Sequence, residues 1–270
     1  MKIIDSGECG SIECGSIVNY ELIEDGVLKI FGIGKMSKSF SFFQGNKNIK
    51  YVVVGNEVTS IGERAFEDCT SLVSIEIPNS VIEIGDNAFR GCASLKSIKI
   101  PNSVMWIGND AFAGCTSLEV IKVDLSNECY SSDNGVLYNK DKSSLIKYPS
   151  GKLEISFIIP NSVIRLECCA FDGSKLLRLI DISNSVRIIE SSVFKNCVSL
   201  KTVEIPNSVI YLGASVFSDC TSLESIKIPN SVTKICSFAF KGCTSLKSIE
   251  IPNSVTKIED NAFESCISLE

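Results

Sequence analysis

Cysteine is the residue type in this sequence with the widest chemical range. The chain of 270 residues has 13 cysteines and no histidine, which excludes catalysis and metal binding that depend on imidazole. Stacked side chains that all point the same way are poorly aligned for disulfides. We therefore interpret one recurring cysteine position as a column of small buried hydrophobic side chains: Cys69, Cys92, Cys115, Cys197, Cys220, Cys243 and Cys266.

Two cysteines near the N-terminus stand outside that column. Cys9 and Cys14 belong to the short tandem ECGSI and ECGS, and they are the best candidates for a disulfide or for half of a zinc site. A zinc site needs about four ligands, and no histidine is present to complete one. We therefore predict no metal site and no cofactor.

The remaining chemistry also argues against an enzyme. No carboxylate pair interrupts the sequence pattern in a way that marks a cleft, so general acid and base catalysis has no obvious site. A hydrolase with a Ser-Lys pair or paired carboxylates is the enzyme alternative. Net charge is −6 with both signs interspersed, which argues against nucleic acid or anionic lipid as a partner.

Hydrophobic segments give little sign of membrane targeting. No apolar stretch reaches the roughly 18 residues of a spanning helix, so we predict no membrane span. The first residues, MKIIDSGECG, lack the apolar region of a signal peptide. The missing signal and the many unpaired cysteines favour the cytoplasm.

A repeat of 23 residues organises the chain. Six intervals between successive copies of Ile-Pro-Asn-Ser-Val are 23 residues, and the step from Ile100 to Ile159 is 59, one regular and one 36-residue turn. This pattern predicts a solenoid of nine turns, the last incomplete. The copies start at Val54 (degenerate), Ile77, Ile100, Ile159, Ile182, Ile205, Ile228 and Ile251.

Each turn has an alternating segment and an Ala-Phe pair. Residues 97–100 alternate polar and apolar, which predicts a short strand with Ile98 and Ile100 buried. One such strand per turn predicts a long parallel sheet. We expect the Ala-Phe pairs on short helical or 3₁₀ segments of the opposite, convex side, and the Asn of each repeat to pair with backbone groups at a corner.

The motif Leu-x-x-Ile-x-Ile-Pro-x-x-Val-x-x-Ile-Gly-x-x-Ala-Phe-x-x-Cys covers residues 51–122 and 155–270 and resembles the BspA-like class of leucine-rich-repeat proteins. The fold expected is an α/β repeat solenoid, a right-handed horseshoe or arc with a parallel sheet on the concave face. The resemblance also implies adhesion or protein interaction at the cell surface or in secreted form, without catalytic residues. Residues 18–36 resemble the family's N-terminal cap, and residues 134–148 its usual insertion.

Four segments are expected. Residues 1–50 form a capping module with a β-hairpin around Glu24-Asp25-Gly26, and residues 51–122 form leucine-rich repeats. Residues 123–158 form an irregular long turn with a hairpin insertion, and residues 159–270 form repeats with an incomplete end. The insertion's two strands would flank residues 139–144.

The outward positions of the predicted strands form the candidate binding face. Most are polar, with charged candidates at Lys99, Lys122, Asp181, Glu204 and Lys227. Val120, Ile158 and Leu179 are apolar and lie on three consecutive predicted strands, so we expect one patch unless the irregular turn covers it. Exposed apolar patches usually mark interaction sites.

The irregular turn supplies a second set of candidates. Aromatic side chains in or beside it are expected to contact a partner: Trp106, Tyr130, Tyr138 and Tyr148. The alternative is a spacer that only bridges two blocks of repeats.

We therefore predict a noncatalytic protein-binding or adhesion scaffold that uses the concave sheet and the adjoining insertion. Its partner would be another protein or a host or matrix macromolecule. The alternative is a structural solenoid, a spacer or lattice element, that self-associates through its open C-terminal end.

Overall fold

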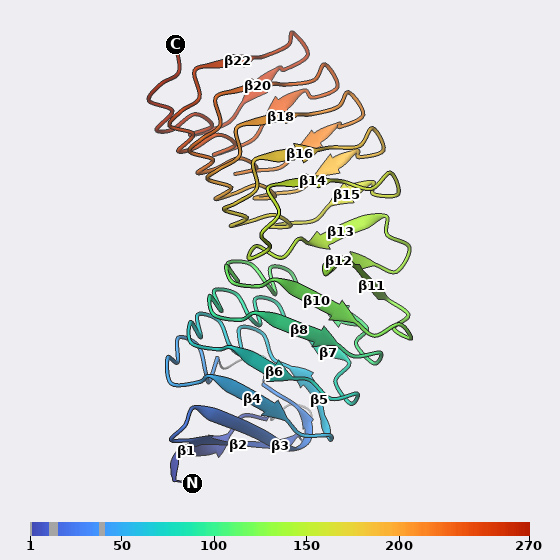
Figure 1. Cartoon of the computed structure of the whole chain (residues 1–270), viewed down its shortest axis with the longest axis vertical. Coiled ribbons are helices and arrows are strands. Elements are labelled where there is room, and N and C mark those ends of the chain that lie inside the picture. The colour runs from blue at the N-terminus through green and yellow to red at the C-terminus, as the bar shows by residue number, and fades with distance from the viewer. Residues whose placement is uncertain (1, 11–15, 38–40) are drawn as a thin grey trace. The chain divides into compact units, whose positions relative to one another are not determined.

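The computed structural model describes residues 2–10, 16–37 and 41–270. These residues form strands and turns and contain no helix (Figure 1). They group into two compact units, Met1–Lys140 and Asp141–Glu270, and each unit is a stack of coils. The predicted solenoid with parallel strands is confirmed, whereas the predicted α/β class is wrong, because no helix accompanies the strands among the described residues.

The first unit begins with an antiparallel sheet. Its hairpin between β2 and β3 turns at Gly26, which has a φ of 83° and donates its N–H to the Ile23 carbonyl at 2.8 Å. β3 then pairs in parallel with two later strands, β4 and β5, so a single long strand serves both strand columns of the unit. The bounds are β1 Ile3–Glu8, β2 Ile17–Ile23, β3 Val27–Lys35, β4 Tyr51–Val54 and β5 Val58–Ile61. The domain boundary at residue 50 stays a prediction.

The regular coils of the first unit carry two strands each. Their pairing follows the repeat, because Tyr51 lies opposite Ser74 and Ser97 lies opposite Val120. Ile98 and Ile100 are both buried, as the alternating pattern predicts. The strands are β6 Ser74–Glu76, β7 Glu83–Ile84, β8 Ser97–Ile100, β9 Trp106–Ile107 and β10 Val120–Val123.

The irregular turn contains a hairpin that the sequence reading missed. β11 (Tyr130–Asp133) and β12 (Val136–Asn139) pair antiparallel around Asn134 and Gly135. Both turn residues have positive φ, 47° and 81°, as a two-residue type I′ turn requires. The hairpin predicted around residues 139–144 would join strands of different units, and it stays a prediction.

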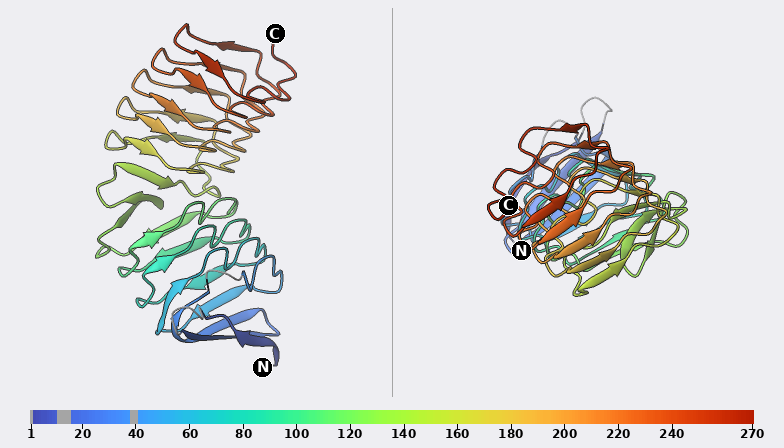
Figure 2. Two further views of the ribbon diagram at one scale, coloured as in Figure 1. Left: turned by 180° about the vertical axis from the view of Figure 1, so that it is seen from behind. Right: turned by 90° about the horizontal axis from the view of Figure 1, so that it is seen from above.

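The second unit has the same coil design. In one column β13, β15, β17 and β19 pair in parallel in that order, and β21 pairs with β23. In the other column β14, β16, β18, β20 and β22 form a five-stranded parallel sheet. Figure 2 shows its strands from behind. The bounds are β13 Ser144–Lys147, β14 Ser156–Ile158, β15 Arg165–Leu166, β16 Leu179–Asp181, β17 Ile188–Ile189, β18 Thr202–Glu204, β19 Tyr211–Leu212, β20 Ser225–Lys227, β21 Lys234–Ile235, β22 Ser248–Glu250 and β23 Lys257–Ile258.

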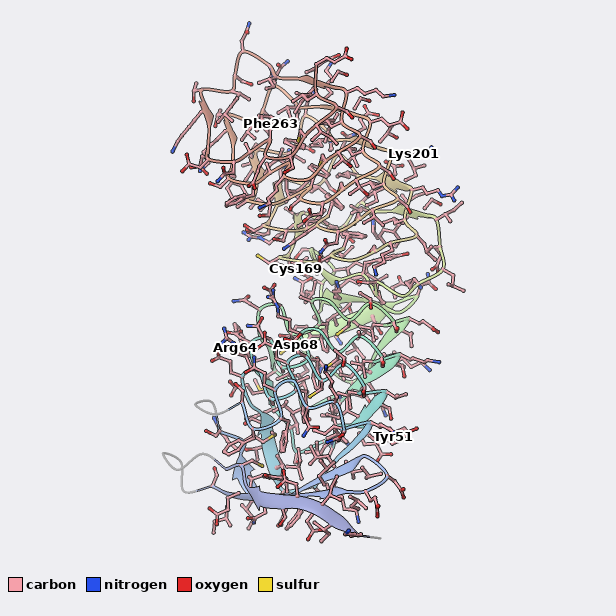
Figure 3. The ribbon with its side chains drawn as sticks, turned by 90° about the vertical axis from the view of Figure 1, so that its left-hand side faces the viewer. Tyr51, Arg64, Asp68, Cys169, Lys201 and Phe263 are labelled. Carbon is pink, nitrogen blue, oxygen red and sulfur yellow. The ribbon has the colours of Figure 1, made fainter. Side chains whose placement is uncertain are left out.

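Turns, not helices, close the side of each coil opposite the long strands. In the first unit Arg64 and Asp68 both have left-handed backbones, with φ of 52° and 58°, and they lie on the opposite side from Tyr51 (Figure 3). A left-handed residue every four positions interrupts an α-helix or 3₁₀-helix. The backbone N–H of Phe66 instead donates to the Ala88 carbonyl of the next coil at 2.8 Å. The predicted helical segments of this side are therefore wrong.

Stacked rings fill the core beside these turns. Phe66 and Phe89 lie 5.6 Å apart with an interplanar angle of 8°, and Phe43 extends the stack before them. In the second unit the stack begins with Tyr148, 5.1 Å from Phe171, and runs to Phe263. Each ring packs on its counterpart one coil away, which ties successive coils together.

The cysteine column is more than a set of apolar side chains. The Cys92 thiol donates to the Phe66 carbonyl at 3.1 Å, and the other six members make the equivalent bond to the preceding coil. Burial raises the pKa of Cys69 and Cys243 to about 12, which keeps these thiols protonated as donors. Cys9 is buried and not in a disulfide, and Cys14 lies outside the described residues.

In most coils a serine hydroxyl, not an asparagine amide, hydrogen-bonds the backbone at the corner; Ser208 is an exception, because its hydroxyl has no hydrogen-bond partner among the described residues. The Ser80 hydroxyl donates to the Val58 carbonyl and the Ser103 hydroxyl to the Val81 carbonyl, both at 2.7 Å. The Asn side chains next to these serines are exposed, as at Asn102. The role expected of the amide is therefore filled by the residue after it in the repeat.

Candidate binding face

The open face of the five-stranded sheet is built by strands of three residues. In β16, Leu179 and Asp181 are exposed and Ile180 between them is buried. β18 and β20 repeat this pattern with their own central residues buried. The central side chains anchor the strand in the core, so the flanking ones must face solvent.

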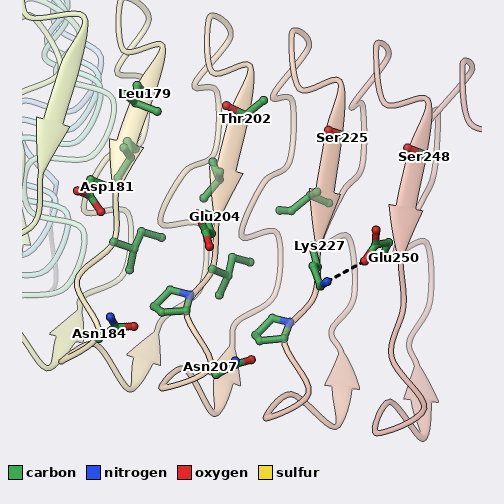
Figure 4. A pocket seen from close by; sticks show the side chains of 17 residues that line it. Leu179, Asp181, Asn184, Thr202, Glu204, Asn207, Ser225, Lys227, Ser248 and Glu250 are labelled. Atoms are coloured by element: carbon green, nitrogen blue, oxygen red, sulfur yellow. Dashed lines mark ion pairs between the residues drawn. The ribbon is translucent and has the colours of Figure 1, made fainter.

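Strand register arranges the outward side chains into two rows (Figure 4). In a parallel sheet, neighbouring members of a row sit about 4.8 Å apart. The start row contains Ser156, Leu179, Thr202, Ser225 and Ser248. The end row contains Ile158, Asp181, Glu204, Lys227 and Glu250.

From β16 to β22, the members of these rows line a groove of about 1040 Å³, and Ser156 and Ile158 lie beside it on β14. The side chains of Asn184 and Asn207 border it beyond the end row (Figure 4). Sequence reasoning assigned these amides to the coil corners and missed their place at the groove. The signal available in the sequence was their spacing, because Asn184 and Asn207 each follow a charged end-row residue by three positions.

The charges of the end row are unevenly matched. The Lys227 ammonium lies 3.1 Å from the Glu250 carboxylate, and both side chains are exposed. Neither Asp181 nor Glu204, which lie opposite each other in the register, has an ion pair with any described residue. The first two strands of the groove, β16 and β18, therefore carry two adjacent carboxylates without an ion-pair partner among the described residues.

Apolar side chains adjoin this acidic pair. Ile158 precedes Asp181 in the end row and is 71% exposed, and Leu179 lies on the same strand as Asp181 and is 52% exposed. Val120 belongs to the first unit and is half-buried. Gly135 packs closely against it, because a Cβ atom at Gly135 would lie 2.7 Å from the Cγ2 atom of Val120. Ile158 and Leu179 are therefore the exposed apolar side chains of the second unit's face, and the three-residue patch that includes Val120 stays a prediction.

The first unit presents its own charged pair. Lys99 and Lys122 lie opposite each other on β8 and β10, and both are exposed. Two adjacent ammonium groups on one face repel each other. They make this surface of the first unit locally basic, whereas the groove of the second unit carries an acidic pair.

The four aromatic candidates of the insertion fall into different environments. Trp106 is 56% exposed and can contact a partner, whereas Tyr130 is half-buried and its hydroxyl accepts the Ile107 N–H at 2.8 Å. Tyr138 and Tyr148 are 2% and 1% exposed. The two buried tyrosines cannot meet a partner, which corrects the prediction; Tyr148 instead heads the ring stack of the second unit.

A buried amide that the sequence reading passed over holds the insertion in place. Asn127 is fully buried at the repeat position of Val104, and its Nδ2 donates to the carbonyls of Pro101 and Val104 at 2.8 and 2.9 Å. Its Oδ1 accepts the N–H groups of Cys129 and Tyr130. All of its amide hydrogen-bonding groups are therefore used inside the protein.

Residues 2–10, 16–37 and 41–270 contain neither a metal-binding cluster nor a membrane-spanning helix. This part of the chain contains no group of three histidine, cysteine or acidic residues placed to hold a metal ion. Nor does it contain a helix long and apolar enough to cross a membrane.

Known proteins share this architecture. A family described as BspA type leucine-rich repeat region matches residues 38–156 and 150–270, with six copies of the repeat. A leucine-rich cell surface protein of Faecalibacterium prausnitzii is 26% identical, with a TM-score of 0.78 and coverage of 100% of this chain and 94% of that one. No curated protein matches the chain.

Two further solved structures are similar. A leucine-rich repeat protein of Eubacterium ventriosum is 25% identical, with a TM-score of 0.72 over 94% of this chain and 81% of that one. The pneumococcal vaccine antigen PcpA is 19% identical, with a TM-score of 0.64 and coverage of 95% of each chain. At that identity, PcpA supports the fold alone.

Proposed function

This chain belongs to the family of BspA-type leucine-rich repeat proteins, and on that premise we propose that it is a noncatalytic scaffold that binds another protein. Leucine-rich repeat proteins are generally noncatalytic scaffolds that bind other proteins. The binding surface proposed is the open face of the five-stranded sheet in the second unit. Trp106 and the pair Lys99 and Lys122 are proposed as additional contacts in the first unit.

One observation carries this proposal: Ile158 and Leu179 are 71% and 52% exposed beside a groove of about 1040 Å³. Elsewhere in the sheet, the same row positions hold serine, threonine or charged side chains. Large exposed apolar side chains beside a concavity typically mark a place where a partner covers them. Polar groups around them would then supply specificity.

We further propose display at the cell surface, with a host or matrix macromolecule as the partner. The similar Faecalibacterium prausnitzii protein is named a cell surface protein. The buried thiols of the cysteine column, whose pKa burial raises, would also tolerate an oxidising exterior. The cytoplasm is the alternative location, and fractionation of the source cells distinguishes the two.

Affinity capture tests the binding surface. Wild-type protein and an Ile158→Ser/Leu179→Ser variant are immobilised and exposed to the same mixture of host and matrix proteins. An Ile164→Ser/Ile210→Ser variant is the control, because Ile164 and Ile210 are 49% and 61% exposed in the same unit but lie outside this sheet. We expect the first variant, and not the control, to lose the retained proteins. Equal retention by all three would refute the proposed surface.

A second candidate function is structural self-association. In the last coil Ile251 and Ile258 are 40% and 50% exposed, whereas their counterparts one coil earlier, Ile228 and Ile235, are 1% and 2% exposed. A second copy could cover these side chains. Light scattering tests this: a molar mass that rises with concentration in wild type but not in Ile258→Glu supports it, and a constant monomer mass contradicts it.

A further inference from the structure

We propose that the groove of the second unit selects a basic segment of polypeptide that also carries an apolar side chain. This inference rests on the proposed function and names the chemistry of the partner. A lysine or arginine of the partner lies between Asp181 and Glu204, and an apolar side chain next to it covers Ile158 and Leu179.

The first step is the charge of the end row. Its four ionisable members are three carboxylates and one ammonium group, and the ammonium of Lys227 is paired with Glu250 at 3.1 Å. The pairing leaves Asp181 and Glu204 uncompensated. Their charges are directly opposite on neighbouring strands, an arrangement that destabilises a sheet. A partner cation between them removes that repulsion.

The second step is the position of the chain's own cations. Each of the four strands from β16 to β22 is preceded by a charged residue, among them Arg178 and Lys201, and Lys201 pairs with Glu224 at 4.0 Å. None of these residues lines the groove. The groove therefore stays acidic along β16 and β18, and the net charge of −6 for the chain attracts a basic partner at long range.

The third step is the apolar border. Ile158 lies one strand from Asp181, in register with it, and Leu179 lies two residues before Asp181 on the same face. A small cation bound at Asp181 would leave the apolar side chains of Ile158 and Leu179 exposed to water, whereas a polypeptide can cover them. In an extended segment, alternate side chains on one face are about 6.8 Å apart, so a basic residue and an apolar one two positions away reach both features together.

The length of the sheet sets the size of the segment. Five strands at about 4.8 Å give roughly 19 Å across the rows, which an extended chain covers with about six residues. We therefore choose the labelled peptide Leu-Ser-Lys-Ser-Lys-Ser as the probe. Leu-Ser-Glu-Ser-Glu-Ser is its matched acidic counterpart.

Fluorescence anisotropy with the purified chain tests the inference. The basic peptide is expected to bind wild type and the acidic peptide is not. Asp181→Asn/Glu204→Gln should weaken the binding of the basic peptide about tenfold, the equivalent of about 1.4 kcal/mol for the loss of both exposed ion pairs with the peptide. The control variant, Glu119→Gln/Glu128→Gln, makes the same change in net charge at two exposed positions of the first unit and should bind like wild type.

Several outcomes overturn the inference: no binding of the basic peptide to wild type, equal binding of the acidic peptide, or equal losses in the groove and control variants. Each is distinguishable from failure of the proposed function. If captured proteins depend on Ile158 and Leu179 but not on Asp181 and Glu204, the binding face stands and the basic partner does not. Circular dichroism of each variant verifies that it is folded.

Discussion

Lys227 turns toward Glu250 and not toward Glu204, with its ammonium 3.1 Å from the Glu250 carboxylate. Glu204 is the neighbour on the other side of Lys227 in the strand register. Lys227 therefore has a carboxylate on each side and forms an ion pair with only one of them. Both side chains of the pair are exposed, which limits its contribution to at most about 1 kcal/mol. The more important consequence is that Asp181 and Glu204 remain in the groove as an acidic pair.

Removing the Lys227 charge should strengthen the binding of a basic segment. In Lys227→Gln the end row loses its only cation, so we expect the basic peptide to bind up to about fivefold more tightly, the equivalent of about 1 kcal/mol. Anisotropy at low and high salt measures the change, which salt should reduce. Lys201→Gln, outside the groove, is the control; weaker binding by Lys227→Gln would contradict this role.

The gap in the cysteine column predicts a stabilising substitution. Ser174 stands at this position, buried, and its hydroxyl has no hydrogen-bond partner among the described residues. A thiol is longer and can reach the Tyr148 carbonyl, as the Cys197 thiol reaches the Phe171 carbonyl. Ser174→Cys should therefore raise the free energy of unfolding by about 1 kcal/mol, measured by urea denaturation.

The reverse change supplies the matched control for that experiment. Cys197→Ser should lower the free energy of unfolding by about 1–3 kcal/mol, because the shorter hydroxyl leaves buried polar groups unpaired. If both substitutions left stability unchanged, the thiol hydrogen bonds would have no energetic role.

The ring stack predicts a difference between its middle and its end. Phe194 is fully buried between Phe171 and Phe217, so Phe194→Ala should cost about 3–5 kcal/mol in free energy of unfolding. Phe263 stacks on Phe240 alone among the described residues and is partly exposed. Phe263→Ala should cost clearly less, and an equal loss would show that stacking between coils does not set the cost.

Glu259 should give the stability a specific acid dependence. Hydrogen bonds from Lys234 and then Lys257, both at 3.1 Å, lower the pKa of Glu259 from 4.5 to about 2. Because the folded pKa lies below the unfolded value, this contribution is complete above about pH 5 and is lost as pH falls from 4.5 to 2. Urea denaturation of wild type and Glu259→Gln should therefore differ at pH 6 and converge near pH 2; a constant difference would contradict it.

Sequence reasoning succeeded where the period alone decides the outcome. Stacking at 23 residues fixes which side chains form a column, and alternation then places Ile98 inward and Asp181 and Glu204 outward. The same logic placed Ile158 and Leu179 on the outward face. This prediction needed no knowledge of distances, because every coil directs the side chains at equivalent repeat positions to the same side of the sheet.

The parts that were missed depend on geometry that residue types do not encode. Arg64 and Asp68 adopt left-handed backbones that non-glycine residues rarely take, so turns could not be distinguished from short helices. Leu145 and Leu166 lie opposite each other in the strand register. Tyr148 follows Leu145 by three residues and Phe171 follows Leu166 by five, yet their rings stack. This difference in spacing hides Tyr148 from a column-by-column comparison of the repeats. The Asn134-Gly135 turn, by contrast, was a readable signal.

The most direct test of the binding face places a photo-crosslinking residue on it. p-Benzoylphenylalanine at Thr202, an exposed start-row position on β18, should crosslink to the captured partner. The same group at Thr233, which is exposed in the same unit just before β21, should not. Mass spectrometry of the irradiated complex decides between them: a crosslink from position 202 alone is the predicted result, and a crosslink from position 233 without one from 202 would contradict the proposed binding face.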